Sequence, residues 1–212
     1  MKDFLIYFFG KGDEVEFANF TFAHFAPILL MFVVILLIFR FREKLRTCKK
    51  EETIRYVLAF MMIISEMSYF WLFSGTIFAL ITPTVITYTG PTRYRYYQFW
   101  LEHTLGYVSI FYMINVHGMR PTIKSAVKSY VALIVLALIA YMANDMIGPG
   151  ANYLFLAKAE DTPSILDILP PNHGLRIAIM AAAITVMFAL SYLPWLLRDR
   201  KERKLREKAM AN

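Results

Sequence analysis

Four ionisable side chains lie within or beside long apolar stretches of the chain, where charged groups are expensive and each is by default a candidate functional residue. They are His24, Glu66, His103 and Asp145. At a rise of about 1.5 Å per helical residue, all four fall in the same half of the predicted membrane-crossing helices. Imidazole and carboxylate groups at one depth predict a polar pocket that opens outward and binds a ligand. For His24, Asp145 and the neighbouring Glu102, the alternative is a simple position at the membrane interface.

Glu66 is the most informative of these residues. It lies roughly 20 Å along its helix from the basic end, well inside the apolar stretch. A carboxyl group at that depth is expected to be protonated or paired with a cation or imidazole. The alternative for Glu66 is a neutral acid that bonds a neighbouring helix.

The residue types argue against a metal site and offer no clear nucleophile. Glu102 and His103 are adjacent, so they point about 100° apart on a helix, and the His-Glu-x-x-His pattern is absent. Cys48 is the single cysteine and falls in a basic segment remote from the predicted pocket. We therefore expect no metal and no cofactor, and the catalytic residues stay unknown.

Five apolar stretches must position these side chains. The chain has 212 residues, of which 58% are hydrophobic and 18% charged, a balance unlike that of a soluble domain. About 20 apolar residues suffice to cross a bilayer. The sequence predicts an all-α transmembrane bundle, a single domain over residues 1–212, with spans at Phe22–Phe39, Tyr56–Val85, Phe99–Val116, Ala126–Ile147 and Ile177–Leu197.

The basic residues predict the orientation of this bundle. Lys and Arg gather in residues 40–55, 120–128 and 198–208, and such segments are retained in the cytoplasm. Five spans with the N-terminus outside place all three segments inside, whereas an even number does not. The net charge of +7 is thus expected to reflect topology and contact with lipids rather than nucleic acid. Residues 198–212 form a basic cytoplasmic tail, and the oligomeric state stays open.

Two connecting segments carry further expectations. The apolar run Phe4–Phe9 is too short for a signal peptide and predicts an interfacial segment. In the external stretch Gly148–Gly174, Thr162-Pro163-Ser164 is typical of a helix start, so a short surface helix over Ile165–Leu169 is expected. Asn152 and Tyr153 of this stretch are added to the pocket as hydrogen-bonding groups.

Several motifs resemble the YwaF family of bacterial integral membrane proteins. They are Tyr69-Phe-Trp-Leu-Phe-Ser-Gly, Leu80-Ile-Thr-Pro, Tyr97-Gln-Phe-Trp-Leu-Glu-His, Gly118-Met-Arg-Pro-Thr, Asn152-Tyr-Leu-Phe-Leu and Thr162-Pro-Ser-Ile-Leu-Asp. The resemblance implies a protein of the bacterial plasma membrane. It also implies a distant similarity to a eukaryotic acyltransferase that acts on ether phospholipids.

The chain departs from that family in one respect. The family usually has seven spans, and its third carries a Leu-Pro-Leu-His-Leu-Cys motif that is thought to supply the nucleophile. This motif is absent here, and the long stretch Tyr56–Val85 resembles the second and fourth family spans joined together. The leading interpretation is therefore a pocket that binds a lipid or small amphiphile. The alternatives are a lipid acyltransferase with His103 as base and the small-molecule capture subunit of a transporter, to which helix interruptions at Ser74-Gly75 and Thr82-Pro83 would be suited.

Overall fold

The computed structural model describes residues 2–9, 20–48, 65–83, 90–158 and 165–210, and the elements within them are all helical. The expected all-α class is confirmed for this part of the chain. The elements are α1 (Lys2–Phe9), α2 (Phe22–Arg46), α4 (Ser65–Trp71), the π-helical turn η1 (Leu72–Thr76), α5 (Ile77–Ile81), α6 (Tyr94–Asn115), α7 (Ile123–Ile147), the 3₁₀ turns η3 (Tyr153–Phe155) and η4 (Ile165–Ile168), and α8 (His173–Met210).

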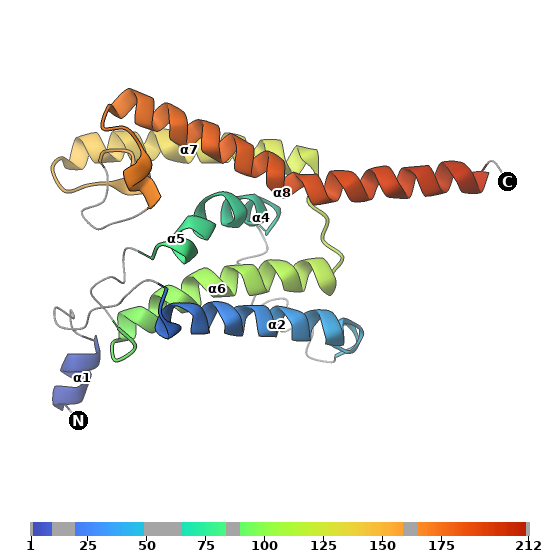
Figure 1. Cartoon of the computed structure of the whole chain (residues 1–212), viewed down its shortest axis with the longest axis horizontal. Coiled ribbons are helices and arrows are strands. Elements are labelled where there is room, and N and C mark those ends of the chain that lie inside the picture. The colour runs from blue at the N-terminus through green and yellow to red at the C-terminus, as the bar shows by residue number, and fades with distance from the viewer. Residues whose placement is uncertain (1, 10–19, 49–64, 84–89, 159–164, 211–212) are drawn as a thin grey trace.

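The helices form three layers, with α4, η1 and α5 between a pair made by α2 and α6 and a pair made by α7 and α8 (Figure 1). Helices α2 and α6 run in the same direction. At one end the Tyr96 hydroxyl donates to the carbonyl of Ala23. At the other end the Arg46 guanidinium donates to the carbonyls of Val116, at 2.7 Å, and Asn115, at 2.9 Å. These bonds fix the two helices at both ends.

Direction alternates along the chain. In Figure 1, α2, α6 and α8 run from the end near the N-terminus toward the end where the C-terminal helix projects, while α4–α5 and α7 run back. The Thr122 and Ser125 side chains form a capping box that starts α7. Helix α8 runs on past Leu197 to Met210, since the basic tail is rich in good helix formers and Arg198 bonds Glu202 one turn later.

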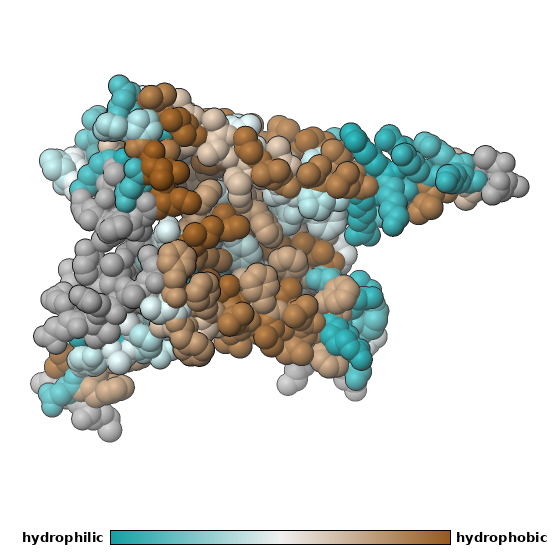
Figure 2. Space-filling view, viewed as in Figure 1, coloured by the Kyte–Doolittle hydropathy of each residue, from teal (hydrophilic) through white to brown (hydrophobic). Residues whose placement is uncertain are grey.

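Three helices are apolar and long enough to cross a membrane: α2, α7 and α8. Most of their apolar side chains face outward, as lipid-facing helices require, and apolar residues form a broad band between more polar ends in Figure 2. Helix α6 has 22 residues but a more polar sequence. The consecutive elements α4, η1 and α5 form the central helix, whose described part has a shorter apolar stretch, Met67–Ile81.

Aromatic side chains form the core around α4 and η1. Phe70 is fully buried and stacks on Phe188 of α8 with ring centroids 5.4 Å apart. The Tyr69 hydroxyl donates to the Ser191 carbonyl at 2.8 Å and accepts from Trp195 Nε1 at 3.0 Å. The side of the central helix that faces α8 is thus closed by rings whose polar atoms bond one another.

Helix α1 and the loop with η3 and η4 lie at the end of the molecule where α2 begins (Figure 1). Residues Phe4–Phe9 belong to α1, which is tied to the start of α6 by a bond between the Tyr7 and Thr92 hydroxyls. In the external stretch, residues Ile165–Ile168 form a single 3₁₀ turn. The predicted helix start at Thr162-Pro163-Ser164 lies outside the described residues.

Candidate functional site

The central helix changes its winding beside the pocket. Residues Leu72–Thr76, which include the Ser74-Gly75 pair, form a π-helical turn, so the interruption is a widened turn rather than a break. Such turns free backbone carbonyls, and here Leu72 receives a hydrogen bond of 2.7 Å from the Tyr107 hydroxyl. The helix then ends at Ile81, before Thr82-Pro83. Single π-helical turns occur frequently at functional sites.

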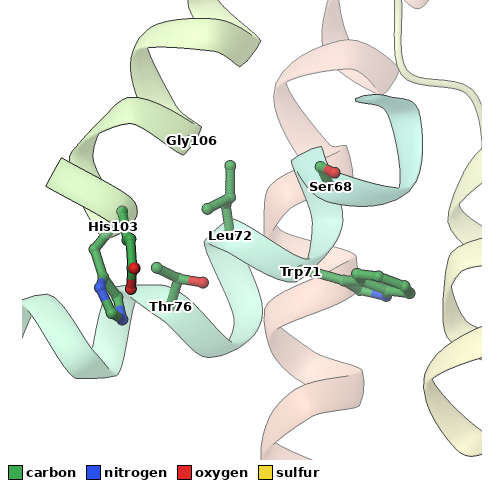
Figure 3. A pocket seen from close by; sticks show the side chains of 7 residues that line it. Ser68, Trp71, Leu72, Thr76, His103 and Gly106 are labelled. Carbon is green, nitrogen blue, oxygen red and sulfur yellow. The ribbon is translucent and has the colours of Figure 1, made fainter. Parts of the chain in front are cut away.

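A pocket of about 240 Å³ lies between this turn and α6. Gly106 allows the close approach of the two helices, since an added Cβ there would lie 2.9 Å from a Leu72 methyl carbon. Figure 3 shows Leu72 between the central turn and Gly106 of α6, whereas Trp71 points to the opposite side of the turn, toward α7. The lining residues are Ser68, Trp71, Leu72, Thr76, Glu102, His103 and Gly106.

His103 is held in one tautomer at the pocket. Its Nδ1 lies 2.8 Å from the carbonyl oxygen of Phe99, one turn earlier, and its ring stacks on Phe99 at 4.1 Å between centroids. Because a carbonyl only accepts, Nδ1 carries the proton, and Nε2 keeps its lone pair. No hydrogen bond between the described residues uses Nε2. His103 can therefore accept a hydrogen bond or a proton from a ligand.

Some of the other polar groups of the pocket form hydrogen bonds with described residues, and others form none. Glu102 is exposed and accepts a bond of 3.0 Å from Gln98 Nε2. The hydroxyls of Ser68 and Thr76 take part in none of the hydrogen bonds between the described residues. Trp71 is fixed, since its Nε1 donates to the Ser129 carbonyl at 3.1 Å. The pocket thus combines a rigid apolar wall with polar atoms that have unused bonding capacity.

His24 lies elsewhere and has a structural setting. It is 1% exposed, its Nδ1 accepts from the Phe20 N–H at 2.9 Å, and its Nε2 donates to the Leu80 carbonyl at 2.7 Å. Both ring nitrogens are bonded, so the residue joins the start of α2 to the end of α5. His24 is not among the residues that line the pocket.

Asp145, Asn152 and Tyr153 are not among the residues that line this pocket either. Glu66 belongs to α4, but its side chain lies outside what the structure describes. Asp145 is exposed in the last turn of α7. Asn152 folds its own loop, since its side chain bonds the N–H groups of Ala157 and Lys158. Of the five predicted residues whose side chains the structure describes, His103 alone is among those that line the pocket.

Tyr153 is held in place through its backbone, while its side chain is exposed. The buried Asn144 amide accepts from the Tyr153 N–H at 2.7 Å and donates to its carbonyl at 3.1 Å. This clamp, along with the pocket residues Ser68, Thr76 and Gly106, was missed as a functional feature by reasoning from ionisable residues alone. The Ser74-Gly75 interruption was the sequence signal nearest to them.

Neither a metal nor a cysteine nucleophile is suggested by the described residues. No three His, Cys, Asp or Glu side chains among them gather in a way that could hold a metal ion. Cys48 is exposed just beyond the basic end of α2, remote from the pocket. The hydroxyls of Ser68 and Thr76 are therefore the groups of nucleophilic type that lie beside His103.

Comparison with known proteins gives one informative result. No curated protein and no solved structure matches the chain. A family model matches residues 4–193, which include the pocket, the central helix and the loop between α7 and α8. The family that it describes carries a different name from the YwaF family suggested by the motifs. The matched region spans most of the chain, which belongs to the TMEM164 family.

Proposed function

We propose that this membrane protein crosses the bilayer five times and binds part of a lipid or small amphiphile in the pocket between α6 and the π-helical turn. Five helical segments of alternating direction support the crossing number. The more polar α6 and the short central helix are sheltered by the three apolar helices, as a bundle in a bilayer allows.

The distribution of charge supports an orientation with the N-terminus outside. The basic end of α2, the connection after α6 and the tail of α8 lie at the same end of the molecule (Figure 2). There Arg120 pairs with Asp199 and Glu202 of α8. Basic segments at one end are typical of the cytoplasmic side. With the resemblance of its motifs, this favours the plasma membrane of a bacterium.

The volume of the pocket limits what it holds. Sites for whole small molecules are usually about 300–1,000 Å³, and this pocket is about 240 Å³. It can take a glycerol ester or a small headgroup, but not a complete lipid. Leu101 and Leu105 of α6 are exposed next to the lining residues, so acyl chains can lie along the outside of the bundle. This combination favours an amphiphile over a polar metabolite.

The observation that carries the proposal is the state of His103. Its Nδ1 is bonded to the Phe99 carbonyl, and its Nε2 is unused beside the equally unused Ser68 and Thr76 hydroxyls. A ligand with hydroxyl or ester groups would complete these hydrogen bonds. Of the six residues predicted from the sequence, the proposal assigns ligand contact to His103 alone.

Acyl transfer is the second candidate function. It is favoured by the same Nε2 lone pair, since a histidine base beside a hydroxyl is the usual way to activate a weak nucleophile. Ser68 or Thr76 would then take the place of the absent cysteine. No hydrogen bond joins either hydroxyl to His103 among the described residues, so a bound substrate would have to bring them together.

The test is to identify lipids that purify with the full chain by mass spectrometry. We expect a bound amphiphile that is reduced at least fivefold in His103→Ala and in Gly106→Ala, because the added methyl group pushes Leu72 into the pocket. His117→Ala, which alters a histidine beyond the opposite end of α6, is the matched control and should keep the ligand.

Two outcomes decide between the candidates. Equal lipid content in the wild type, His103→Ala and Gly106→Ala would refute the binding proposal. Turnover of a radiolabelled acyl lipid by the purified wild type, lost in His103→Ala and kept in His117→Ala, would establish the enzyme instead. A hydroxyl nucleophile predicts that Ser68→Ala or Thr76→Val also abolishes that turnover.

A further inference from the structure

A buried arginine that forms no ion pair with any other described residue lies in the first turn of α8. Arg176 is 6% exposed, and its one hydrogen bond runs from Nη2 to the Phe155 carbonyl at 3.3 Å. Its Nε is buried without a partner. None of the ion pairs between the described residues includes Arg176. Arginine keeps its charge inside proteins, and an unpaired buried charge is costly, so an anion would relieve this arrangement.

The position of Arg176 on its helix increases the excess of positive charge. Helix N-termini carry partial positive charge and bind anions through free N–H groups. Asn172 bonds the N–H groups of Leu175 and Arg176. The N–H groups of His173 and Gly174 have no partner among the described residues, and a Cβ added at Gly174 would meet just the Asn172 Oδ1, at 3.7 Å. Backbone donors without a partner among the described residues therefore belong to the same helical turn as Arg176.

The loop opposite this helix end is fixed in an unusual conformation. Leu154 and Phe155 both have φ near 55°, a region that side chains rarely adopt. Asn144 clamps the backbone of Tyr153, and His173 Nε2 bonds the Leu156 carbonyl at 2.7 Å. Backbone held in such a conformation by several polar side chains is typical of ligand sites. The loop and the start of α8 thus form one rigid unit.

A second buried arginine, Arg93, has a partner for its charge and serves for comparison. Arg93 is 5% exposed, and its Nε also lacks a hydrogen bond. Its guanidinium, however, lies 3.6 Å from the centre of the Tyr7 ring and donates to the Tyr7 carbonyl. The ring provides a cation–π interaction, and no such contact between described residues includes Arg176. Arg93 is therefore a matched control.

We infer that Arg176 and the free N–H groups at the start of α8 bind a phosphate group, supplied by a phospholipid headgroup or by free phosphate. The planar guanidinium has donors that match phosphate oxygens. The apolar stretch of α8 expected from the sequence begins at Ile177, directly after Arg176, which places the site at the boundary where headgroup phosphates lie. The lipid source rests on the membrane crossing proposed above. The site is separate from the His103 pocket, whose lining does not include Arg176.

The experiment measures thermal unfolding and binding of the full chain in detergent with three probes. These are inorganic phosphate, a short-chain phosphatidylcholine and the diacylglycerol of the same chain length, which lacks phosphate. We expect phosphatidylcholine to raise the Tm and diacylglycerol to leave it unchanged. Arg176→Gln should weaken the phosphate-dependent affinity at least tenfold, Arg176→Lys should weaken it less, and Arg93→Gln should keep it.

The Tm of Arg176→Gln measured without a probe shows whether Arg176 binds phosphate or only stabilises the loop through its bond to Phe155. Removing an uncompensated charge should leave the Tm of probe-free Arg176→Gln equal to or above that of the wild type. A Tm lowered equally with and without probe, or a wild-type response in Arg176→Gln, would overturn the proposal. Since that variant can fail to fold, the wild type also decides: no shift with either phosphate-containing probe overturns it.

The two phosphate sources give different patterns. A shift with phosphatidylcholine alone supports a headgroup site, and an equal shift with inorganic phosphate supports a site for the free ion. His103→Ala should keep the phosphate-dependent shift even where it loses the pocket lipid. Failure of the pocket proposal and failure of this one are thus observed in different variants.

Discussion

The two sides of the central helix differ in how fully their polar groups are used. Toward α7 and α8, Tyr69 bonds Ser191 and Trp195, and the hydroxyl of Ser129 bonds the Met67 carbonyl. Toward α6, the Ser68 and Thr76 hydroxyls and the Nε2 of His103 have no partner among the described residues. One helix thus presents a closed side that holds the bundle and an open side that has room for a ligand.

The difference follows from the residues that face the helix. On the closed side, Phe188 and Trp195 fill the space with rings. On the open side, Gly106 offers no side chain, and the π-helical turn shifts the residues that follow it. Proteins keep unsatisfied polar groups mainly where a ligand or water completes them. The comparison predicts that mutations on the closed side change stability and those on the open side change binding.

The largest effect is expected for Phe70→Ala. Phe70 is fully buried, and its ring stacks on Phe188. Truncating a buried aromatic ring usually costs about 3–5 kcal/mol, from lost contacts and a residual cavity. Thermal unfolding in detergent should show a large drop in Tm, with lipid content per folded molecule unchanged. A loss of bound lipid without a loss of stability would contradict the division into two sides.

A matched pair of hydroxyl deletions gives the next effect. Tyr69→Phe removes the partner of Trp195 Nε1 and leaves this buried donor unsatisfied, which should cost about 1–3 kcal/mol of unfolding free energy. Thr76→Val deletes a hydroxyl that bonds no other described residue, and it should change stability by less than about 0.5 kcal/mol while lowering lipid retention. If both variants lose similar stability, the open side is part of the structural core and no pocket function is needed.

The sequence predicted the helical class and the positions of the helices better than the site. Apolar length and basic flanks predict the starts of α2, α7 and α8 within a few residues, because crossing a bilayer imposes a local requirement on composition. Helices α2 and α8 continue beyond the predicted apolar spans, and the charged tail of α8 is helical through local pairs such as Arg198 and Glu202. Five crossings and the orientation stay predictions.

The pocket is harder to predict because the sequence does not show which hydrogen-bond partners an ionisable side chain has in the folded protein. His24 and His103 have equal chemistry in the sequence, and each bonds a backbone group four residues earlier through Nδ1. The difference is the distant carbonyl of Leu80, which bonds Nε2 of His24, whereas Nε2 of His103 has no partner among the described residues. Depth along a helix shows that polar residues share a level, but not which way they face. The π-helical turn beside the pocket contacts Tyr107 and Gly106 of α6 through Leu72, and a pairing between these two helices cannot be read from either segment alone.

The smallest effect is expected for Glu202→Gln at the basic end of the molecule, where α8 is tied to the connection after α6. Arg198 and Arg120 bond the Glu202 carboxylate and hold its pKa below its ordinary value. Such a group contributes stability above its ordinary pKa, and the contribution is lost as the pH falls through the lowered one. The wild-type Tm should thus differ slightly from that of Glu202→Gln at pH 7, and the difference should disappear as the pH falls through the lowered pKa of Glu202.

The salt dependence of the Tm of Glu202→Gln can be compared with that of Phe70→Ala on the closed side of the central helix. The ion pairs at Glu202 are exposed to solvent, so salt should screen them and reduce the difference in Tm between the wild type and Glu202→Gln. The closed side is dry and aromatic, so the Tm difference between the wild type and Phe70→Ala should not respond to salt. A difference in Tm that does not respond to salt would mean that Glu202 supports the packing of α8 directly. The closed side would then include the basic end of α8.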